Sequence, residues 1–239
     1  MLENISIHKI LFIDVETVPV APTFSELSED FQSLWAEKTR WQRPEGQTPN
    51  EFYVLKAGVM AEFAKVICIS LGYIYEKNNT SFFRIKSFYG DDEQLLLNEF
   101  KTLLDDKFST KDHYLCAHNG KEFDYPFLCR RMIVNGVSLP KILEIAGKKP
   151  WEVRHLDTME IWKFGDYKHY TSIKLLAALF DIPTPKDDID GSKVAKVYWQ
   201  EHDLERIRLY CQKDTLTVAQ ILLKYMGKPI LTEEQIEVA

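Results

Sequence analysis

The sequence has no run of apolar residues long enough to cross a membrane. Its longest apolar stretches, residues 10–13 and 66–71, are far shorter than the about 18 residues that a membrane-spanning helix requires. The first residues include an acid and lack the basic segment that opens a secretory signal peptide. We therefore expect a cytoplasmic protein that does not contact a membrane.

Cysteines are few, and basic residues are outnumbered. The four cysteines (Cys68, Cys116, Cys129 and Cys211) form no C-x-x-C pair and have apolar neighbours, which favours buried reduced thiols over a disulfide or zinc framework. The 30 Lys and Arg residues against 36 Asp and Glu residues give a formal net charge of −6. This charge excludes a generally basic nucleic-acid-binding coat. It leaves room for a local basic groove, because net charge does not describe how charge is distributed.

The rest of the composition is that of an ordinary globular protein. The 239 residues are 45% hydrophobic and 28% charged, without internal repeats. We expect one domain over residues 1–239. Hydrophobic periodicity predicts strands at residues 9–13, 64–75, 81–89 and 114–117, and helices at residues 92–108, 124–135 and 203–226. This order of strands and helices predicts a mixed α/β layer fold.

Residues 18–61 lack strand signals and are predicted to form a partly helical insertion between the first two strands. The insertion carries Trp35, Trp41, Phe52 and Tyr53. Two interpretations of these aromatic residues are open. They pack against the main body of the protein, or they present a platform on which nucleic-acid bases stack.

Asp14 and Glu16 follow the first apolar run directly. In an extended strand, residues i and i+2 point to the same face, so both carboxylates project together from the end of a buried strand. Two like charges side by side are costly unless a cation lies between them. Oxygen ligands suit hard divalent cations such as Mg²⁺ and Mn²⁺. The D-x-E pattern also occurs at residues 91–93 and 203–205, but only the first copy ends an apolar run.

Asp214 interrupts the apolar stripe of the last predicted helix. The stripe steps by three or four residues except between Cys211 and Val218, and Asp214 fills that gap. A carboxylate on the core-facing side of a helix needs a partner, which is a salt bridge, a capping contact or a metal. Tyr210 precedes Asp214 by four residues, so the two side chains lie on one face of the helix.

A further acid, Asp124, follows the short strand at residues 114–117 and a turn that contains Gly120. Taken alone, Asp124 is a favourable charge or cap at the N-terminus of a helix. Together with Asp14, Glu16 and Asp214, it becomes a fourth candidate ligand for a divalent cation.

In this order, the three acidic segments resemble the exonuclease motifs of the DnaQ-like, or DEDD, 3′–5′ exonuclease superfamily. The matching segments are residues 13–17 (Ile-Asp-Val-Glu-Thr), 119–124 (Asn-Gly-Lys-Glu-Phe-Asp) and 210–214 (Tyr-Cys-Gln-Lys-Asp). The Tyr-x-x-x-Asp form of the third motif is that of the tyrosine subclass, DEDDy. Two segments, residues 61–69 and residues 210–214, are most similar to those of stand-alone bacterial exonucleases related to the proofreading domain of family B DNA polymerases.

The resemblance implies a ribonuclease H-like fold, a mixed sheet with helices on both faces, whose motif acids meet at one edge of the sheet. It implies that Asp14, Glu16, Asp124 and Asp214 hold two divalent metal ions, Mg²⁺ or Mn²⁺. Two-metal sites stabilise both the attacking and the leaving oxygen of a phosphodiester. It also implies that Tyr210 orients the attacking water. A tyrosine with its ordinary pKa of about 10 is a poor base at pH 7, so orientation suits this residue better than proton abstraction.

Substrate contacts are also implied. The backbone around Thr17 is where the family usually meets the terminal 3′ hydroxyl, and Asn119 and Phe123 lie beside the second motif. Phe123 is equally open to interpretation as a core residue. Lys121 and Lys174 are candidates for phosphate contacts, against the alternative that they are solvated surface charges.

The expected activity is hydrolysis of single-stranded nucleic acid from its 3′ end, DNA in preference to RNA, to nucleoside 5′-monophosphates. A polymerase or repair protein acting in trans is the protein partner that the kinship suggests. Asp157 ends another short apolar stretch and is a candidate for supporting the site rather than for binding metal. Two alternatives remain. One is a nucleic-acid-binding module with a decayed site, against which the intact acids and Tyr210 argue. The other is a haloacid-dehalogenase-type phosphatase, whose D-x-D-G-[ST] motif is matched at residues 188–192, but after loop-forming residues instead of a strand.

Overall fold

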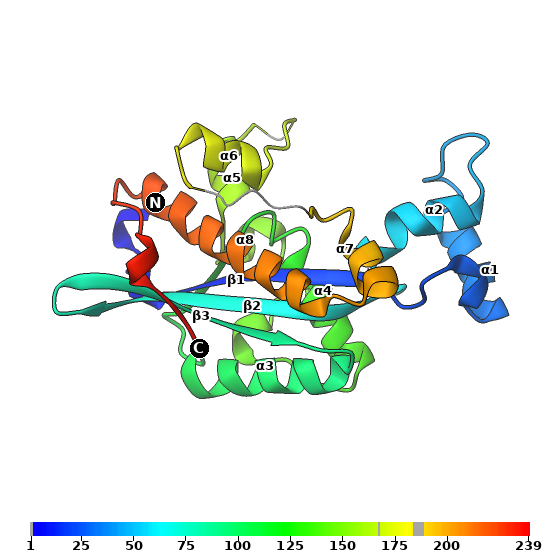
Figure 1. The fold of residues 1–239 in the computed structure, drawn as a ribbon, viewed down its shortest axis with the longest axis horizontal. Helices are drawn as coiled ribbons and strands as arrows, with labels where there is room; N and C mark the ends of the chain where they lie inside the picture. Colours follow the sequence, from blue (N-terminus) through cyan, green and yellow to red (C-terminus); the bar gives the residue numbers. More distant parts are fainter. Residues whose placement is uncertain (1, 167, 184–188) are drawn as a thin grey trace.

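A six-stranded mixed sheet forms the centre of the computed structural model, which describes residues 2–166, 168–183 and 189–239 (Figure 1). The strand order is β5-β4-β1-β2-β3-β6. The strands are β1 (Ile10–Pro19), β2 (Ala64–Lys77), β3 (Thr80–Tyr89), β4 (Tyr114–Ala117), β5 (Leu156–Asp157) and β6 (Ile236–Val238). The pairs β1–β2 and β2–β3 are antiparallel, whereas β1–β4, β4–β5 and β3–β6 are parallel.

Helices cover both faces of this sheet, so the predicted mixed α/β, ribonuclease H-like fold is confirmed. Helix α8 crosses one face, and α3 and α4 pack on the other (Figure 1). The α-helices are α1 (Glu29–Lys38), α2 (Pro49–Lys56), α3 (Glu93–Lys107), α4 (Asp124–Val134), α5 (Thr158–Lys163), α6 (Ile173–Leu179), α7 (Val194–Lys196) and α8 (Leu204–Tyr225). Short 3-10 helices are η1 (Leu2–Asn4), η2 (Ile7–Lys9), η3 (Phe24–Glu26), η4 (Ala57–Val59), η5 (Lys141–Leu143), η6 (Pro150–Glu152) and η8 (Glu233–Gln235), and η7 (Val197–Glu201) is π-helical.

Strand β1 determines which way the first two acids point. Ile13 and Val15 join the hydrophobic core formed with α3 and α4. Phe12 joins the core formed with α8 on the opposite face. Because successive side chains of a strand alternate between its faces, Asp14 and Glu16 continue the row of Phe12 and point to the face that α8 crosses.

β1 is longer than the predicted strand at residues 9–13, because pairing with β2 continues as far as Pro19. A bulge between Glu16 and Thr17 shifts the register without ending the strand. The sequence pattern did not predict the second half of β1, because two acids interrupt the apolar run. Asp14 and Glu16 therefore lie inside a strand, and the expectation that they follow its end is wrong.

The insertion between β1 and β2 has a small hydrophobic core of its own. It comprises residues 20–63 rather than 18–61, because β1 runs to Pro19 and β2 begins at residue 64. Its core consists of buried Leu27, Trp35, Phe52, Tyr53, Ala57 and Phe63. Three of the four aromatic residues therefore pack within the insertion, not on the main body. Trp41 is 87% exposed, and helices α1 and α2 extend from one end of the molecule (Figure 1).

The long helices agree with the sequence prediction to within two residues. The carboxylates of Asp92 and Asp203 accept hydrogen bonds from the backbone amides three residues later, at 3.0 Å in each case, and so cap α3 and α8. The four cysteines are free thiols. The described ranges contain no helix that is both long and apolar enough to cross a membrane.

Candidate active site

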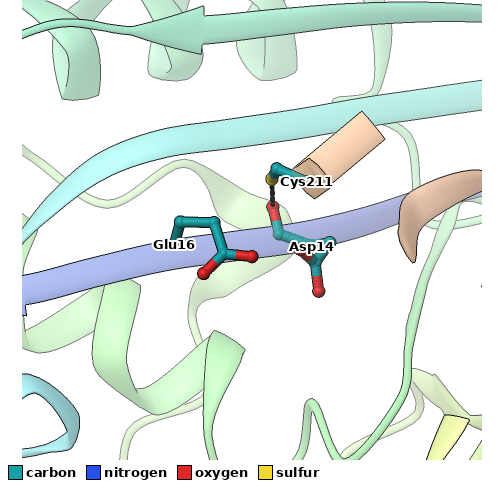
Figure 2. A group of neighbouring side chains, drawn as sticks. All are labelled: Asp14, Glu16 and Cys211. Carbon is teal, nitrogen blue, oxygen red and sulfur yellow. Dashed lines mark hydrogen bonds between the residues drawn. The ribbon is translucent and has the colours of Figure 1, made fainter. Parts of the chain in front are cut away.

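Asp14 and Glu16 bring two carboxylates together beneath α8 (Figure 2). Their carboxylate oxygens and the Sγ of Cys211 lie within 4.8 Å of one another. Burial raises the pKa of both carboxyls well above the ordinary range, and the negative charge of Asp214 raises both further. Charge on both carboxylates is therefore unfavourable unless a proton or a cation accompanies them.

Cys211 links α8 to β1. Its buried thiol donates a hydrogen bond to the backbone carbonyl of Asp14 at 3.4 Å (Figure 2). Burial raises the pKa of the thiol well above its ordinary value, so the sulfur stays protonated. Two neighbouring contacts fix the same register, from Gln212 Nε2 to Ser87 Oγ at 2.9 Å and from Thr215 Oγ1 to the Ser70 carbonyl at 3.4 Å.

The register of α8 directs Tyr210 and Asp214 toward the acids of β1. The Tyr210 side chain is buried, and a side-chain hydrogen bond joins it to Asp214. Burial, followed by the charges of Asp214 and Glu16, raises the pKa of Tyr210 well above its ordinary value. Tyr210 is therefore a neutral hydroxyl at any physiological pH. Asp214, read from the sequence as a polar interruption of the apolar stripe, faces a cavity.

Asp124 reaches the same place from the first turn of α4. The helix begins at Asp124 itself, so the interpretation of this residue as an N-cap is wrong, although its charge still favours the helix N-terminus. The parallel pairing of β1 with β4 ends at Phe12, which leaves the backbone amide of Val15 to donate to the Asp124 carboxylate. Burial raises the pKa of Asp124 to about 8, against the lowering effect of these backbone hydrogen bonds.

These five residues line one cavity of about 490 Å³, which we call the acidic cavity. Three segments far apart in the sequence supply them, as the motif order predicted. Within the described part of the chain, Lys174 is the one lysine or arginine in the lining, and Asp190 adds a fifth carboxylate. The remaining lining residues are Val15, Val59, His118, Asn119, Phe123, Tyr170, Ser172, Ile173 and Gly191.

Of the proposed substrate contacts, the structure places Asn119, Phe123 and Lys174 in the lining of the acidic cavity. Phe123 also packs on its neighbour Phe127, with ring centroids 5.2 Å apart, so it is both a core residue and a cavity residue. Thr17 and Lys121 are not among the described lining residues.

The two candidates outside the lining have other partners. The Thr17 hydroxyl donates to the Gly58 carbonyl at 2.6 Å. Lys121 Nζ forms an ion pair with Glu160 at 2.6 Å. Contacts of substrate with the backbone around Thr17 and with the Lys121 side chain stay predictions.

Asp157 holds the turn that carries the second motif. Its carboxylate accepts hydrogen bonds from the backbone amides of Asn119 at 2.9 Å and Lys121 at 3.1 Å. The same carboxylate caps α5 by accepting from the amides of Met159 and Glu160 at 3.0 and 3.2 Å. Asn119 has a φ of 64°, a left-handed conformation that a non-glycine residue adopts at some cost. Asp157 therefore supports the site without facing it, as the sequence suggested.

His118 is a functional residue that sequence reasoning missed. Its ring bridges the Thr158 hydroxyl at 2.9 Å and the Thr171 carbonyl at 2.8 Å, so it attaches the segment that carries Tyr170 and Lys174 to the end of β4. Burial lowers the pKa of His118, which keeps the ring neutral. Its one sequence signal is its position directly before the second motif.

The phosphatase-like motif at residues 188–192 has no support in the structure. Asp188 lies outside the described residues. Asp190 belongs to no helix or strand, and its carboxylate accepts a hydrogen bond from the Ser192 amide at 3.0 Å in a local turn. The strand that should precede such a nucleophile is absent from the described residues on either side.

The residues of the acidic cavity fit divalent cations. The Oδ2 atom of Asp14 is buried and has no hydrogen-bond partner among the described residues, which is costly for a carboxylate. The oxygen donors of Asp14, Glu16, Asp124 and Asp214 are of the hard type that Mg²⁺ and Mn²⁺ prefer. The acidic cluster can therefore hold metal, and its donors do not favour one of these two ions over the other.

Comparison with known proteins gives one family. The model of a family described as a predicted 3′–5′ exonuclease related to the exonuclease domain of PolB matches residues 59–236. No curated protein matches the chain. The matched range includes Asp124, Tyr210 and Asp214, whereas Asp14 and Glu16 precede it.

Proposed function

The chain belongs to the family of predicted 3′–5′ exonucleases related to the exonuclease domain of PolB, and from this premise we propose that it degrades single-stranded nucleic acid from the 3′ end. The proposed substrate is DNA in preference to RNA, because the family is related to a DNA polymerase domain. The proposed products are nucleoside 5′-monophosphates and a shortened strand with a new 3′ hydroxyl. The observation that carries the proposal is the convergence of Asp14, Glu16, Asp124, Tyr210 and Asp214 on one cavity.

Asp14, Glu16, Asp124 and Asp214 are the residues that would hold two divalent ions, Mg²⁺ or Mn²⁺. The raised carboxyl pKa values and the unpartnered Oδ2 of Asp14 support this assignment, because both mark a cavity short of positive charge. When bound, such ions offset the negative charge that develops on the phosphate and lower the pKa of a water molecule bound to them.

The chain's own residues position the substrate and the water. Tyr210 keeps its proton and is hydrogen-bonded to Asp214, so it orients the attacking water and does not take a proton from it. Lys174 brings the positive charge that a backbone phosphate needs in an otherwise acidic lining. Asn119 and Phe123 contact the terminal nucleotide, the first through its amide and the second through its ring.

A gel assay with single-stranded DNA and RNA of one sequence, labelled at the 5′ or the 3′ end, tests this proposal. With Mg²⁺ or Mn²⁺, we expect 5′-labelled DNA to give a ladder that shortens from the 3′ end, and EDTA to abolish it. Faster degradation of RNA would reverse the proposed sugar preference. Binding of either strand without hydrolysis in either metal would favour the decayed-site alternative.

A further inference from the structure

A second cavity, of about 290 Å³, lies beyond the opposite ends of β4 and β5. Its cationic lining residues are Lys111, Lys141, Lys148 and Arg154, and we call it the basic pocket. Glu144 is the one acid among its described lining residues. In a chain with a net charge of −6, this local excess of positive charge is the reverse of the overall balance.

The cations of the basic pocket are available to a ligand. Lys111, Lys141 and Lys148 are exposed, and none forms an ion pair within the described part of the chain. Arg154 is held in place because its guanidinium donates to the backbone carbonyls of Lys111 and His113 and lies over the Tyr114 ring, 4.8 Å from the centroid. The pocket thus combines one cation held by hydrogen bonds with three solvent-exposed ones.

The basic pocket and the acidic cavity lie at opposite ends of β4. Lys111 precedes β4, and Asn119 follows it. The eight residue steps from Lys111 to Asn119 span at most about 26 Å at roughly 3.3 Å per residue. His155, on the wall of the basic pocket, is buried, and burial together with the positive charge of Arg154 lowers its pKa to about 4, so its ring adds no positive charge to the pocket. Lys121, in the turn beside the acidic cavity, is paired with Glu160 at 2.6 Å, so the cations that are free to meet a strand are those of the basic pocket itself.

An exposed aromatic residue accompanies these cations. Trp151 lies in the segment between Lys148 and Arg154 and is 73% exposed, with Lys149 Nζ 5.2 Å from its ring centroid. A group of cations with an exposed aromatic ring in the neighbouring segment suits a polynucleotide strand, because phosphates meet the cations and any base can stack on the ring. A free phosphate would use the cations alone.

We propose that the basic pocket binds the phosphodiester backbone of the substrate strand a few nucleotides from its 3′ end, which the acidic cavity receives. The inference rests on the proposed function and deepens it, since it predicts a preference for strands long enough to reach both cavities. Binding through the backbone carries no base preference.

The test compares two substrates in the doubly substituted chain Lys141→Ala/Lys148→Ala. One is a 20-nucleotide single strand, and the other is thymidine 5′-p-nitrophenyl phosphate, which fills the acidic cavity alone. We expect KM for the strand to rise about tenfold and the slope of log KM against log salt to fall by about two. KM and kcat for the small ester should not change. Lys141→Arg/Lys148→Arg should restore strand binding, and Lys77→Ala, an exposed lysine on the far side of β1, should behave as the unaltered chain.

An unchanged KM and salt slope for the strand would overturn the proposal. A chain that hydrolyses neither substrate would contradict the proposed function instead, and fluorescence anisotropy with the labelled strand in EDTA then tests the pocket separately. There, weaker strand binding by the double variant but not by Lys77→Ala supports the pocket, and equal binding by all three chains excludes it. If inorganic phosphate displaces the strand from the unaltered chain but not from the double variant, phosphate is the group that the basic pocket recognises.

Discussion

The acidic cavity and the basic pocket lie at opposite ends of β4 and differ in how their charges are held. The acidic cavity places five carboxylates around one lysine, and the basic pocket places four cations around one carboxylate. Packing between β1, α4 and α8 buries the acids, and their pKa values rise. The lysines of the basic pocket remain in solvent, where charge costs little.

This difference shows that the acidic cavity, and not the basic pocket, lowers the stability of the folded chain. A row of exposed lysines needs no special support, whereas buried like charges persist only because the surrounding structure holds them together. Asp157, His118 and Cys211 are the supports at the acidic cavity, and each is bonded to a backbone group or to another element. The contrast predicts that changes at the acidic cavity affect catalysis and stability together.

The largest expected effect follows from neutralising one buried acid. Asp14→Asn should lower kcat about 10³-fold or more, because it removes a group central to charge stabilisation in the site. In EDTA at pH 8 it should also raise Tm by roughly 2–4 °C, since the amide neither buries a charge nor holds a proton that the unfolded chain would release. Activity assays and calorimetry measure the two effects. The matched control is Asp30→Asn, an exposed acid on α1, and a similar change in that variant would contradict the explanation.

Removing the support of the second motif should have the next largest effect. Asp157→Ser keeps an N-cap for α5 but cannot reach the amides of Asn119 and Lys121, so we expect kcat to fall about 10–100-fold with a smaller change in KM. Steady-state kinetics on a single strand provide the measurement. Asp92→Ser, the equivalent change at the N-cap of α3, should alter stability alone. Equal losses of activity in the two variants would make Asp157 a merely structural residue.

Removal of the Tyr210 hydroxyl should cost about tenfold in kcat, because an orienting group is lost and no catalytic base is removed. The raised pKa of Tyr210 keeps it protonated throughout the accessible range. The pH profile of Tyr210→Phe should therefore have the same shape as that of the unaltered chain. Disappearance of an ionisation from the profile would show that Tyr210 acts as a base.

The pH dependence of stability should separate the two cavities in the absence of metal. Asp14, Glu16 and Asp124 have raised pKa values in the folded chain, so the folded state holds protons that the unfolded state has released. Stability is then complete below the ordinary carboxyl pKa of about 4 and falls as pH rises above it, by about 1.4 kcal/mol per pH unit for each such proton. For Asp124 this fall continues to about pH 8.

Thermal unfolding in EDTA between pH 5 and pH 8 measures this slope. Asp124→Asn should flatten it, and Mn²⁺ should restore stability at pH 8. Lys141→Ala/Lys148→Ala should leave the slope unchanged, because these lysines lie at the other end of β4 from the buried acids. A slope of the opposite sign would contradict the burial of the acids.

The smallest expected effect comes from the basic pocket's own acid. Glu144→Gln removes the one carboxylate of the described lining and should lower KM for a 20-nucleotide strand about twofold, a typical size for an exposed charge. KM for thymidine 5′-p-nitrophenyl phosphate should not change. A higher KM for the strand would mean that Glu144 assists binding and does not oppose it.

Sequence periodicity predicted the layers of the fold and the long helices, because α3, α4 and α8 each carry a regular apolar face. It missed the second half of β1, since charged residues at a functional site break the apolar run that marks a strand. It also missed β6 and the independent core of the insertion. A strand of three residues carries too little pattern, and periodicity does not say which elements an aromatic side chain will meet.

The acids of the site could be predicted because each motif lies in a short stretch of sequence. The residues that hold the motifs in place contact them from distant parts of the chain, so the sequence does not reveal them. Asp157 meets Asn119 across 38 residues, and His118 meets Thr171 across 53. Asp190 enters the acidic cavity from a loop that has no helical or strand signal. The basic pocket gathers lysines from segments whose charge is unremarkable one segment at a time, so only the fold brings them together.

The central claim is that the acidic cavity hydrolyses phosphodiesters from the 3′ end with divalent cations. Its most direct test is to identify what a single strand releases in Mg²⁺ and in EDTA, with the unaltered chain and Asp14→Asn side by side. We predict nucleoside 5′-monophosphates, released in order from the 3′ end, by the unaltered chain in Mg²⁺ alone. Equal release by Asp14→Asn, release in EDTA, or nucleoside 3′-monophosphates as products would contradict the claim.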